Sequence, residues 1–212
     1  MTDAEALARF EALVQAQRPA DQPWSPVTDY SYAARVEAEG QHPDHIVEVF
    51  QPKHVLDVGC GPGHLVSMLR QRGIDARGCD KQATDPAAKY DVTDFRRTCI
   101  LFDMGNDTIG RPDLVICREV LEHLTIREVK QAVVNLCVLS QRYVYVTTRF
   151  AQAPDHLLAV DTSDNLDPTP ITMLNQDFLR LLFVLEGFIR RPDLEERLDW
   201  QRKGRVLVYQ RP

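Results

Sequence analysis

The sequence lacks a long apolar run and a basic N-terminal stretch, since Met1 is followed by Thr2, Asp3 and Glu5. We therefore expect neither a secretory signal nor a membrane span, and a cytoplasmic protein is the simplest prediction. The cysteines are few and scattered, with no C-x-x-C pair and no closely spaced Cys/His set. They stand at Cys60, Cys79, Cys99, Cys117 and Cys137. This spacing fits neither a disulfide framework nor a zinc finger.

An excess of positive charge is also missing, because 31 acidic residues outnumber 25 Lys and Arg and the net charge is −6. This is the wrong sign for a protein whose affinity comes mainly from neutralising nucleic-acid phosphates. No internal repeat or low-complexity segment is present. The 212 residues, 44% of them hydrophobic, predict one domain with a core of its own, without disulfide or metal staples.

Helical patterns dominate the first 50 residues. Residues 4–17 place apolar side chains on one stripe behind a capping box of Thr2 and Glu5, and further helices are expected over 32–39 and 44–50. Between them, residues 18–30 hold three prolines with large aromatic side chains, which predicts an irregular but anchored stretch.

From position 54 onward, short β-rich runs alternate with helical stretches, which predicts an α/β fold with a mostly parallel sheet. The expected strands are 55–58, 74–79, 113–117, 143–148 and 205–210, and the expected helices are 64–72, 126–140 and 173–186. The last helix is so apolar that we expect it to be deeply packed, with Gly187 at its end. No βαβ crossover helix is evident between about 188 and 210, so the final two strands are expected to form an antiparallel excursion at the sheet edge.

The most informative stretch is 54–65, where a strand leads through Gly59, Gly61 and Gly63 directly into a helix. Glycines at such a turn permit positive φ and let backbone N–H groups approach a ligand at the positive end of a helix. Asp80 follows the next strand, where an acid can accept both hydroxyls of a ribose. Together these features predict a nucleoside-bearing ligand.

The choice of nucleoside follows from the details of this loop. The dinucleotide fingerprint requires a third glycine at the sixth position, where this sequence has His64, and the Walker P-loop pattern is absent. Asp57 stands two residues before the loop, where its charge would repel a pyrophosphate and favour a cationic ligand such as a sulfonium.

These residues resemble the first motif of the class I S-adenosylmethionine-dependent methyltransferases, which Val55 to Gly63 matches closely. Asp80 is similar to the ribose-binding acid of that family, and Tyr90-Asp91-Val92 resembles its adenine-binding segment. The stretch 112–124 resembles its fourth strand with the downstream helix. The resemblance spans roughly residues 50–150.

The resemblance implies a doubly wound, seven-stranded Rossmann-like sheet with an antiparallel last strand, over residues 51–212. Residues 1–50 would form an N-terminal helical cover within the same domain, and the cofactor would be S-adenosylmethionine. By the same resemblance, the cofactor-binding residues are Asp57, Gly59, Cys60, Gly61, Gly63, Asp80, Asp91, Val92, Cys117 and Arg118. Cys60 and Cys117 are expected to act there as small buried apolar side chains, because nothing nearby marks either as a nucleophile.

Glu119, Glu122 and His123 share one face if this segment is helical. A group of RNA 2′-O-methyltransferases has a similar pattern that holds a divalent ion with another histidine, for which His156 is the candidate here. Small-molecule methyltransferases without a metal also look the same at this segment. We expect no metal. His123 is the candidate general base with Glu122 beside it, and the alternative is a structural role of the pair beneath the cofactor loop.

The acceptor can be narrowed only by missing motifs. No Asp/Asn/Ser-Pro-Pro-Tyr/Phe tetrad follows the fourth strand and no Pro-Cys nucleophile is present, which disfavours DNA bases. The sequence thus predicts methyl transfer to a hydroxyl or amine of a small molecule, with a metal-assisted RNA 2′-O-methyltransferase or a non-catalytic S-adenosylmethionine-binding module as alternatives. Residues 151–170 are expected to be either the substrate-recognition loop or a surface insertion.

Overall fold

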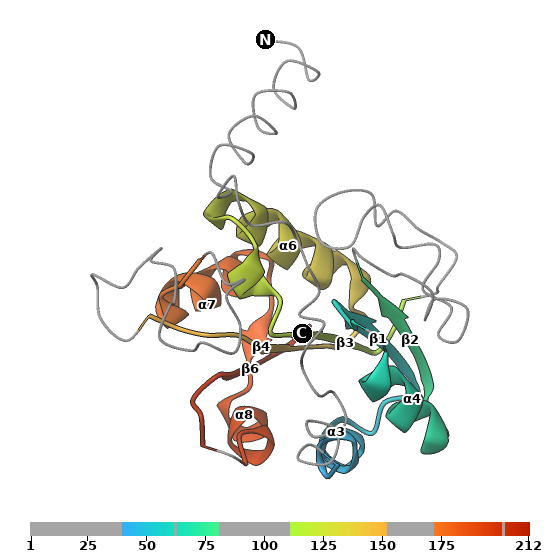
Figure 1. The fold of residues 1–212 in the computed structure, drawn as a ribbon. Coiled ribbons are helices and arrows are strands. Elements are labelled where there is room, and N and C mark those ends of the chain that lie inside the picture. Colours follow the sequence, from blue (N-terminus) through green and yellow to red (C-terminus); the bar gives the residue numbers. More distant parts are fainter. Residues whose placement is uncertain (1–39, 62, 81–110, 152–171, 201) are drawn as a thin grey trace, which may run out of the picture.

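The computed structural model describes residues 40–61, 63–80, 111–151, 172–200 and 202–212, and the strands in these ranges form one sheet (Figure 1). The strand order in this six-stranded sheet is β2-β1-β3-β4-β6-β5. The strands are β1 (His54–Val58), β2 (Asp75–Cys79), β3 (Leu114–Arg118), β4 (Tyr143–Thr147), β5 (Ile189–Arg190) and β6 (Val206–Gln210).

Strands β1 to β4 pair in parallel, whereas β6 runs antiparallel to both β4 and β5. The chain proceeds from β1 outward to β2 and then crosses back to β3 on the other side of β1, which is the doubly wound arrangement. The predicted α/β class and the antiparallel last strand are confirmed. The described residues supply six strands, where the resemblance implied seven.

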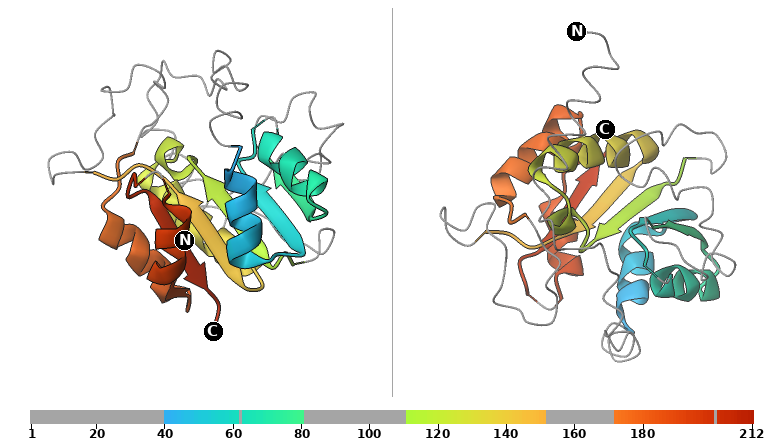
Figure 2. Two further views of the ribbon diagram at one scale, coloured as in Figure 1. Left: turned by 90° about the horizontal axis from the view of Figure 1, so that it is seen from below. Right: turned by 45° about the horizontal axis from the view of Figure 1, so that its top comes forward.

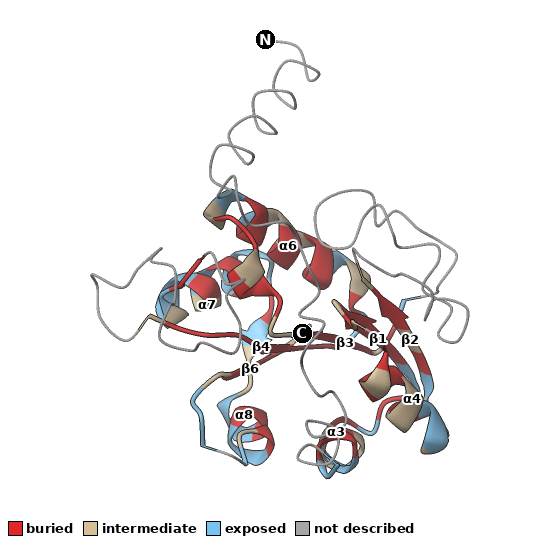
Figure 3. Cartoon of the chain, in the orientation of Figure 1, coloured by how far each residue is buried: buried red, intermediate tan, exposed pale blue. Residues whose placement is uncertain are grey.

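Helices cover both faces of this sheet (Figures 1 and 2). One face carries α6 (Ile126–Leu139) and α7 (Gln176–Leu185), preceded by the short 3-10 turn η2 (Leu121–His123). The opposite face carries α3 (His42–Phe50), α4 (His64–Gln71) and α8 (Pro192–Leu198). Alternate residues of each strand point into the two resulting cores, so the strands are buried almost throughout (Figure 3).

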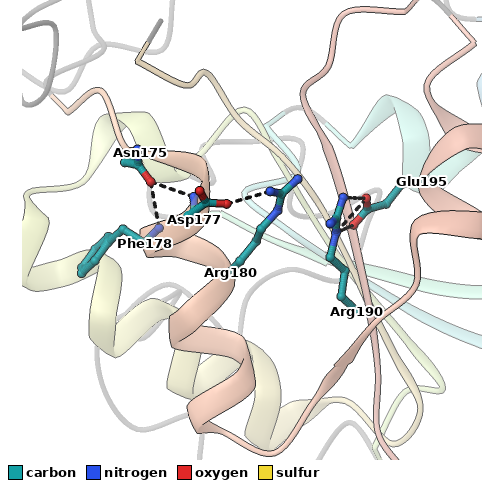
Figure 4. Close-up of polar contacts among 6 residues, drawn as sticks. All are labelled: Asn175, Asp177, Phe178, Arg180, Arg190 and Glu195. Atoms are coloured by element: carbon teal, nitrogen blue, oxygen red, sulfur yellow. Dashed lines mark hydrogen bonds and ion pairs between the residues drawn. The ribbon is translucent and has the colours of Figure 1, made fainter. Parts of the chain in front are cut away.

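Capping residues mark the ends of α6 and α7, and α6 begins at Ile126 as predicted, whereas α7 begins at Gln176 rather than at 173. The Thr125 side chain accepts a hydrogen bond from the Glu128 N–H, and the Glu128 carboxylate accepts one from the Thr125 N–H. Asn175 caps α7 by accepting from two backbone N–H groups (Figure 4). At its other end Gly187, with φ of 81°, is followed by a hydrogen bond from the Phe188 N–H to the Phe183 carbonyl.

The prediction that this apolar helix is deeply packed is wrong. Leu179, Leu182 and Phe183 are buried, but Leu181 and Leu185 expose 53% and 70% of their surface. A helix lying on one face of a sheet buries a single stripe, so apolar residues all round it cannot all be covered.

The predicted antiparallel excursion at the sheet edge is confirmed, because β5 pairs antiparallel to β6 at that edge. The short helix α8, which the sequence analysis did not single out, lies between these two strands. Its pattern is short, with only Leu194 and Leu198 to form a buried pair one turn apart. A partly buried ion pair ties this helix to the preceding strand: Arg190 Nη2 lies 2.6 Å from Glu195 Oε2 (Figure 4). Glu195 also accepts a hydrogen bond from the Val208 N–H of β6, so its carboxylate joins β5, α8 and β6.

The predicted helices at 4–17 and 32–39 and the 151–170 loop lie outside the described residues, apart from residue 151. Within the described ranges, no helix is long and apolar enough to cross a membrane. Helix α3, the one part of the expected N-terminal cover that is described, shares its core with β1, β4 and α8 through Ile46 and Phe50.

Candidate cofactor and active site

The candidate site lies at the carboxyl ends of β2, β1 and β3. In the strand register Val58 of β1 is paired with Cys79 of β2 and with Cys117 of β3, so the three strands end at one level. The glycine loop after β1 is therefore flanked by Asp80 on one side and Arg118 on the other. In doubly wound sheets this reversal point of the strand order is where ligands bind.

The three loop glycines all have the backbone conformation that the sequence predicts. Gly59, Gly61 and Gly63 have φ of 76°, 52° and 83°. Gly59 has a second reason to lack a side chain, because a Cβ there would lie 2.3 Å from Cγ2 of Val120. Val120 thus backs the loop from the segment after β3. The sequence analysis missed this residue, because nothing in its local pattern marks it.

Gly78 in β2 was also missed. A Cβ at this position would lie 2.7 Å from the Cys60 sulfur and 2.9 Å from Cγ2 of Val66, so the loop and α4 pack directly on the bare backbone of β2. The available signal was a glycine inside a short strand, which often marks a close backbone approach.

The backbone N–H groups of the loop are used within the protein. Those of Gly59 and Cys60 both donate to the Cys79 carbonyl, at 2.7 and 3.1 Å, and that of Gly63 donates to the Cys60 carbonyl at 2.9 Å. The expectation that these amides are directed at a ligand is therefore wrong. Instead, those of Gly59 and Cys60 join the loop to the end of β2, and that of Gly63 forms a hydrogen bond within the loop.

The remaining positions of the loop follow the same pattern. The Gly61 N–H donates to the Asp80 carboxylate at 2.9 Å, and Pro62 has no N–H at all. A phosphate-binding loop depends on several outward backbone N–H groups. Positions 59–63 have none left for this purpose, so the turn is not built to hold a phosphate.

Asp57 is buried at the end of β1, with 4% of its surface exposed. Burial raises the pKa of its carboxyl to about 7, the Arg118 guanidinium opposes this shift, and the Asp80 carboxylate adds to it. The charges of both Asp80 and Arg118 thus act on the Asp57 carboxyl. A cation bound nearby would favour its ionised form.

Asp80 and the β3 residues lie where the sequence places them around the loop. Asp80 is half-buried and directly contacts it, whereas Cys60 and Cys117 are buried, as expected of small apolar side chains. The four described cysteines are free. Asp91 and Val92, predicted to meet adenine, lie outside the described residues.

The condition under which Glu119, Glu122 and His123 would share one face is not met, because the segment is not an α-helix. Glu119 has a left-handed backbone with φ of 52°, and only a 3-10 turn follows it. Among the described residues, no three His, Cys, Asp or Glu side chains gather in a way that could hold a metal ion. His156 lies outside the described residues.

Glu122 is buried rather than exposed. It is 1% exposed, and its Oε2 accepts a hydrogen bond from Thr148 Oγ1 at 2.7 Å. Burial and the neighbouring Glu119 carboxylate raise the pKa of Glu122 well above its usual value. His123 is half-buried on the same turn, where its backbone N–H donates a hydrogen bond to the Val120 carbonyl. Their predicted catalytic roles stay predictions.

These features fit S-adenosylmethionine. The half-buried carboxylate of Asp80 at the end of β2, beside the glycine turn, is placed to accept ribose hydroxyls. A second carboxyl in Asp57 suits the positive charges of an ammonium and a sulfonium. Fold and site together thus define a doubly wound α/β domain with a site for a cationic nucleoside.

Comparison with known proteins agrees. Residues 37–180, more than half of the chain, match the family model described as a methyltransferase domain. The chain belongs to this family, the class I S-adenosylmethionine-dependent methyltransferases, and its cofactor is S-adenosylmethionine. The class of protein, the enzyme class and the cofactor predicted from the sequence are confirmed at this level.

Among curated proteins, the chain is 31% identical over 115 residues to a ubiquinone biosynthesis O-methyltransferase of Chromobacterium violaceum, a match covering 51% of this chain and 49% of that one. It is 34% identical over 80 residues to the protein of the same name from Bordetella avium, covering 35% and 33%. The chain thus spans about half the length of the first of these relatives and about a third of the second.

The fold is similar to that of magnesium protoporphyrin IX methyltransferase from Synechocystis PCC 6803 with bound SAH, with a TM-score of 0.58, 19% identity and coverage of 97% and 94%. It is also similar to an O-methyltransferase family protein from Burkholderia thailandensis, with a TM-score of 0.55, 16% identity and coverage of 98% and 68%. At these identities the likeness concerns the fold.

Proposed function

We propose that this chain transfers a methyl group from S-adenosylmethionine to a hydroxyl group of a small molecule. One observation carries the donor half of this proposal. The backbone N–H groups of the loop after β1 form hydrogen bonds within the protein, and the carboxyl groups of Asp57 and Asp80 flank the loop. Such a site disfavours nucleoside phosphates and favours a cationic nucleoside.

For the donor, we assign Asp80 to the ribose hydroxyls and the loop from Gly59 to Gly63 to the methionyl part. Asp57 supports this loop and offsets positive charge beside it. Cys117 and Arg118 line the cleft with their backbone at the end of β3. Asp91 and Val92 keep their predicted contact with adenine.

Bound S-adenosylmethionine supplies a methyl group on a good leaving group. The protein therefore has to position the acceptor in line, exclude water and, for a hydroxyl acceptor, take a proton. Glu122 supports the site indirectly in this proposal, because its hydrogen bond with Thr148 connects the turn behind the loop to the end of β4. The sequence predicts His123 on that turn as the general base, and His42 is a competing candidate for this role.

The choice of oxygen over nitrogen rests on the curated relatives, which are named O-methyltransferases. A structural neighbour, a 1,6-didemethyltoxoflavin-N1-methyltransferase of Burkholderia thailandensis, has a similar fold with a TM-score of 0.50 and 14% identity, so the fold alone does not select the acceptor atom.

The test has two stages. Calorimetric titration with S-adenosylmethionine and S-adenosylhomocysteine should show binding of both, and NADH and ATP should not compete. The protein and a donor labelled in its methyl group are then incubated with a small-molecule extract, and the labelled product is identified. Binding of NADH or ATP in place of S-adenosylmethionine contradicts the donor assignment. Donor binding without any labelled product supports a non-catalytic S-adenosylmethionine-binding module. A label on a nitrogen atom of the product contradicts the proposal of a hydroxyl acceptor.

A further inference from the structure

A group of polar side chains lies at the carboxyl edge of β3 and β4, on the face covered by α3. In the strand register Arg118 is paired with Thr147, and both point to the same face as Tyr145, because alternate strand residues share a side. Tyr145 packs against Phe50 of α3, which identifies that face. We call His42, Tyr145, Thr147 and Arg118 the acceptor-side cluster.

His42 comes to this edge because of the chain connection. Three residues, 51–53, join the end of α3 to the start of β1, so the helix runs back along the sheet and its first residue lies near the carboxyl ends of the strands. His42 is 3% exposed, and its Nε2 lies 2.9 Å from the Tyr145 hydroxyl. The two rings meet edge to face, with centroids 5.8 Å apart.

Two atoms of the cluster are enclosed without a hydrogen-bond partner among the described residues: Nδ1 of His42 and Oγ1 of Thr147. Leaving a buried polar atom without a hydrogen bond is unfavourable, so such atoms in one small region indicate a ligand. A hydroxyl group is a suitable ligand, since it donates one hydrogen bond and accepts others.

The imidazole of His42 is in the form that such a hydroxyl requires. Burial, the Arg118 guanidinium and His45 together hold the pKa of His42 well below its usual value. The ionisable groups facing it are Arg118 from β3, Tyr145 from β4 and His45 from its own helix. A neutral imidazole carries one N–H and one lone pair. If Nε2–H donates to Tyr145, Nδ1 has the lone pair.

We propose that His42 binds the acceptor hydroxyl through Nδ1 and takes its proton, with Tyr145 holding the imidazole in the required tautomer. This proposal rests on the proposed function. The acceptor oxygen gives its proton to Nδ1 while it bonds to the donor methyl carbon. The carbon–sulfur bond breaks with its electron pair left on sulfur, and the extra proton of the imidazolium then passes to water. The positive charge of Arg118 favours acidic hydroxyls, such as phenols, whose oxygen becomes negative along this path.

The first experiment uses 4-nitrocatechol, whose absorption changes when its hydroxyl ionises, added to the full chain saturated with S-adenosylhomocysteine. No methyl transfer is possible in this complex, so the spectrum reports binding and ionisation alone. The wild-type complex should bind the probe and shift its ionisation to lower pH. His42→Gln should weaken binding of the probe at least tenfold and abolish the shift, because the glutamine amide can still reach Tyr145 but has nothing in place of Nδ1.

Methyl transfer from S-adenosylmethionine to 4-nitrocatechol is then followed as a function of pH. We expect His42→Gln to lower kcat about 100-fold at neutral pH, and the loss should shrink as the probe ionises by itself at higher pH. Tyr145→Phe should lower kcat less, by about 10-fold, because the imidazole remains but its tautomer is no longer fixed. Affinity for S-adenosylhomocysteine should stay unchanged in both variants. The matched control is His54→Gln, at the exposed opposite end of β1, which should behave as wild type.

A measurement on the wild-type protein tests the proposal even if the variants fail to fold. Long-range proton–nitrogen NMR spectra of the S-adenosylhomocysteine complex should show His42 neutral with its proton on Nε2. The proposal is overturned if the proton lies on Nδ1 or if the wild-type complex does not bind 4-nitrocatechol. It is also overturned if His42→Gln weakens donor and acceptor binding equally, or if its loss of kcat is not rescued at high pH. A kcat loss confined to His123→Gln restores the base that the sequence predicts. Failure of S-adenosylhomocysteine to bind at all contradicts the proposed function instead.

Discussion

The two halves of the candidate site are built in different ways. The donor half, at β1 and β2, consists of a contiguous glycine loop and one acid, joined by backbone hydrogen bonds from Gly59 and Cys60 to Cys79. The acceptor half, at β3 and β4, gathers side chains from positions as far apart as His42 and Tyr145. The donor half is thus defined by backbone shape and the acceptor half by side-chain chemistry. One half is constrained by close packing, and the other holds polar atoms that have no hydrogen-bond partner among the residues that the structure describes.

The largest effect is expected at the loop. Gly59→Ala should lower the free energy of unfolding by about 2 to 4 kcal/mol, since the new Cβ both overlaps Val120 and takes a left-handed backbone. Chemical denaturation measures this. Gly73→Ala is the matched control, because its φ of 79° is similar but no atom lies within 4 Å of the added Cβ, so it should cost about 1 kcal/mol.

A double variant sharpens this test. Val120→Ala should cost less stability in the Gly59→Ala background than alone, because it removes the overlapping methyl groups. Equal losses for Gly59→Ala and Gly73→Ala would show that packing against Val120 is not what requires a glycine in the donor half.

Asp57 should make stability depend on pH. Its folded-state pKa of about 7 lies above the ordinary 3.8, so the stability linked to its protonated form is complete below about pH 4 and is lost as the pH rises to about 7. Asp57→Asn should flatten this slope and stabilise the ligand-free protein at pH 8 by on the order of 2 kcal/mol. Denaturation at pH 4, 6 and 8 measures both.

Asp44 provides a control of opposite sign. Its hydrogen bond with Arg72 lowers the pKa of the Asp44 carboxyl, so any stability that it confers is present at neutral pH and is lost as the pH falls below 3.8. Asp44→Asn should therefore leave the Asp57 slope in place. An unchanged slope in Asp57→Asn would mean that this carboxyl is already ionised in the folded protein.

Asp80→Asn should weaken binding of S-adenosylmethionine by about 1 to 3 kcal/mol, since the ribose hydroxyls lose a charged acceptor. Calorimetry measures this, with Asp75→Asn at the exposed opposite end of β2 as control. If the two variants bind the donor equally well, the ribose assignment is wrong.

The smallest effect on stability is expected in the acceptor half, where a substitution should stabilise the protein rather than destabilise it. Thr147→Val replaces a buried hydroxyl without a partner by a methyl group and should stabilise the protein by about 0.5 to 1 kcal/mol, with donor affinity unchanged. Thermal or chemical denaturation measures it. Destabilisation would show that this hydroxyl is already satisfied and would remove the contrast between the two halves.

The elements with strong periodic patterns could be predicted, and those shaped by their neighbours could not. The capping box at Thr125 and Glu128 marks α6 in the sequence because it is local. Helix α8 carries only one apolar pair, too little for a periodic signal, and it depends on the contact of Glu195 with Arg190 and β6. The exposed side of α7 escaped prediction because its composition does not show which face meets the sheet.

The sequence by itself determined the α/β class, the glycine turn, the acid after the second strand and the donor that they suit, because each depends on residues close together in the chain. Only the tertiary structure decided that Val120 and Gly78 enclose the turn, that the loop amides are used internally, and that His42 meets Tyr145. These depend on close packing and hydrogen bonds between segments far apart in the chain, which leave no local pattern.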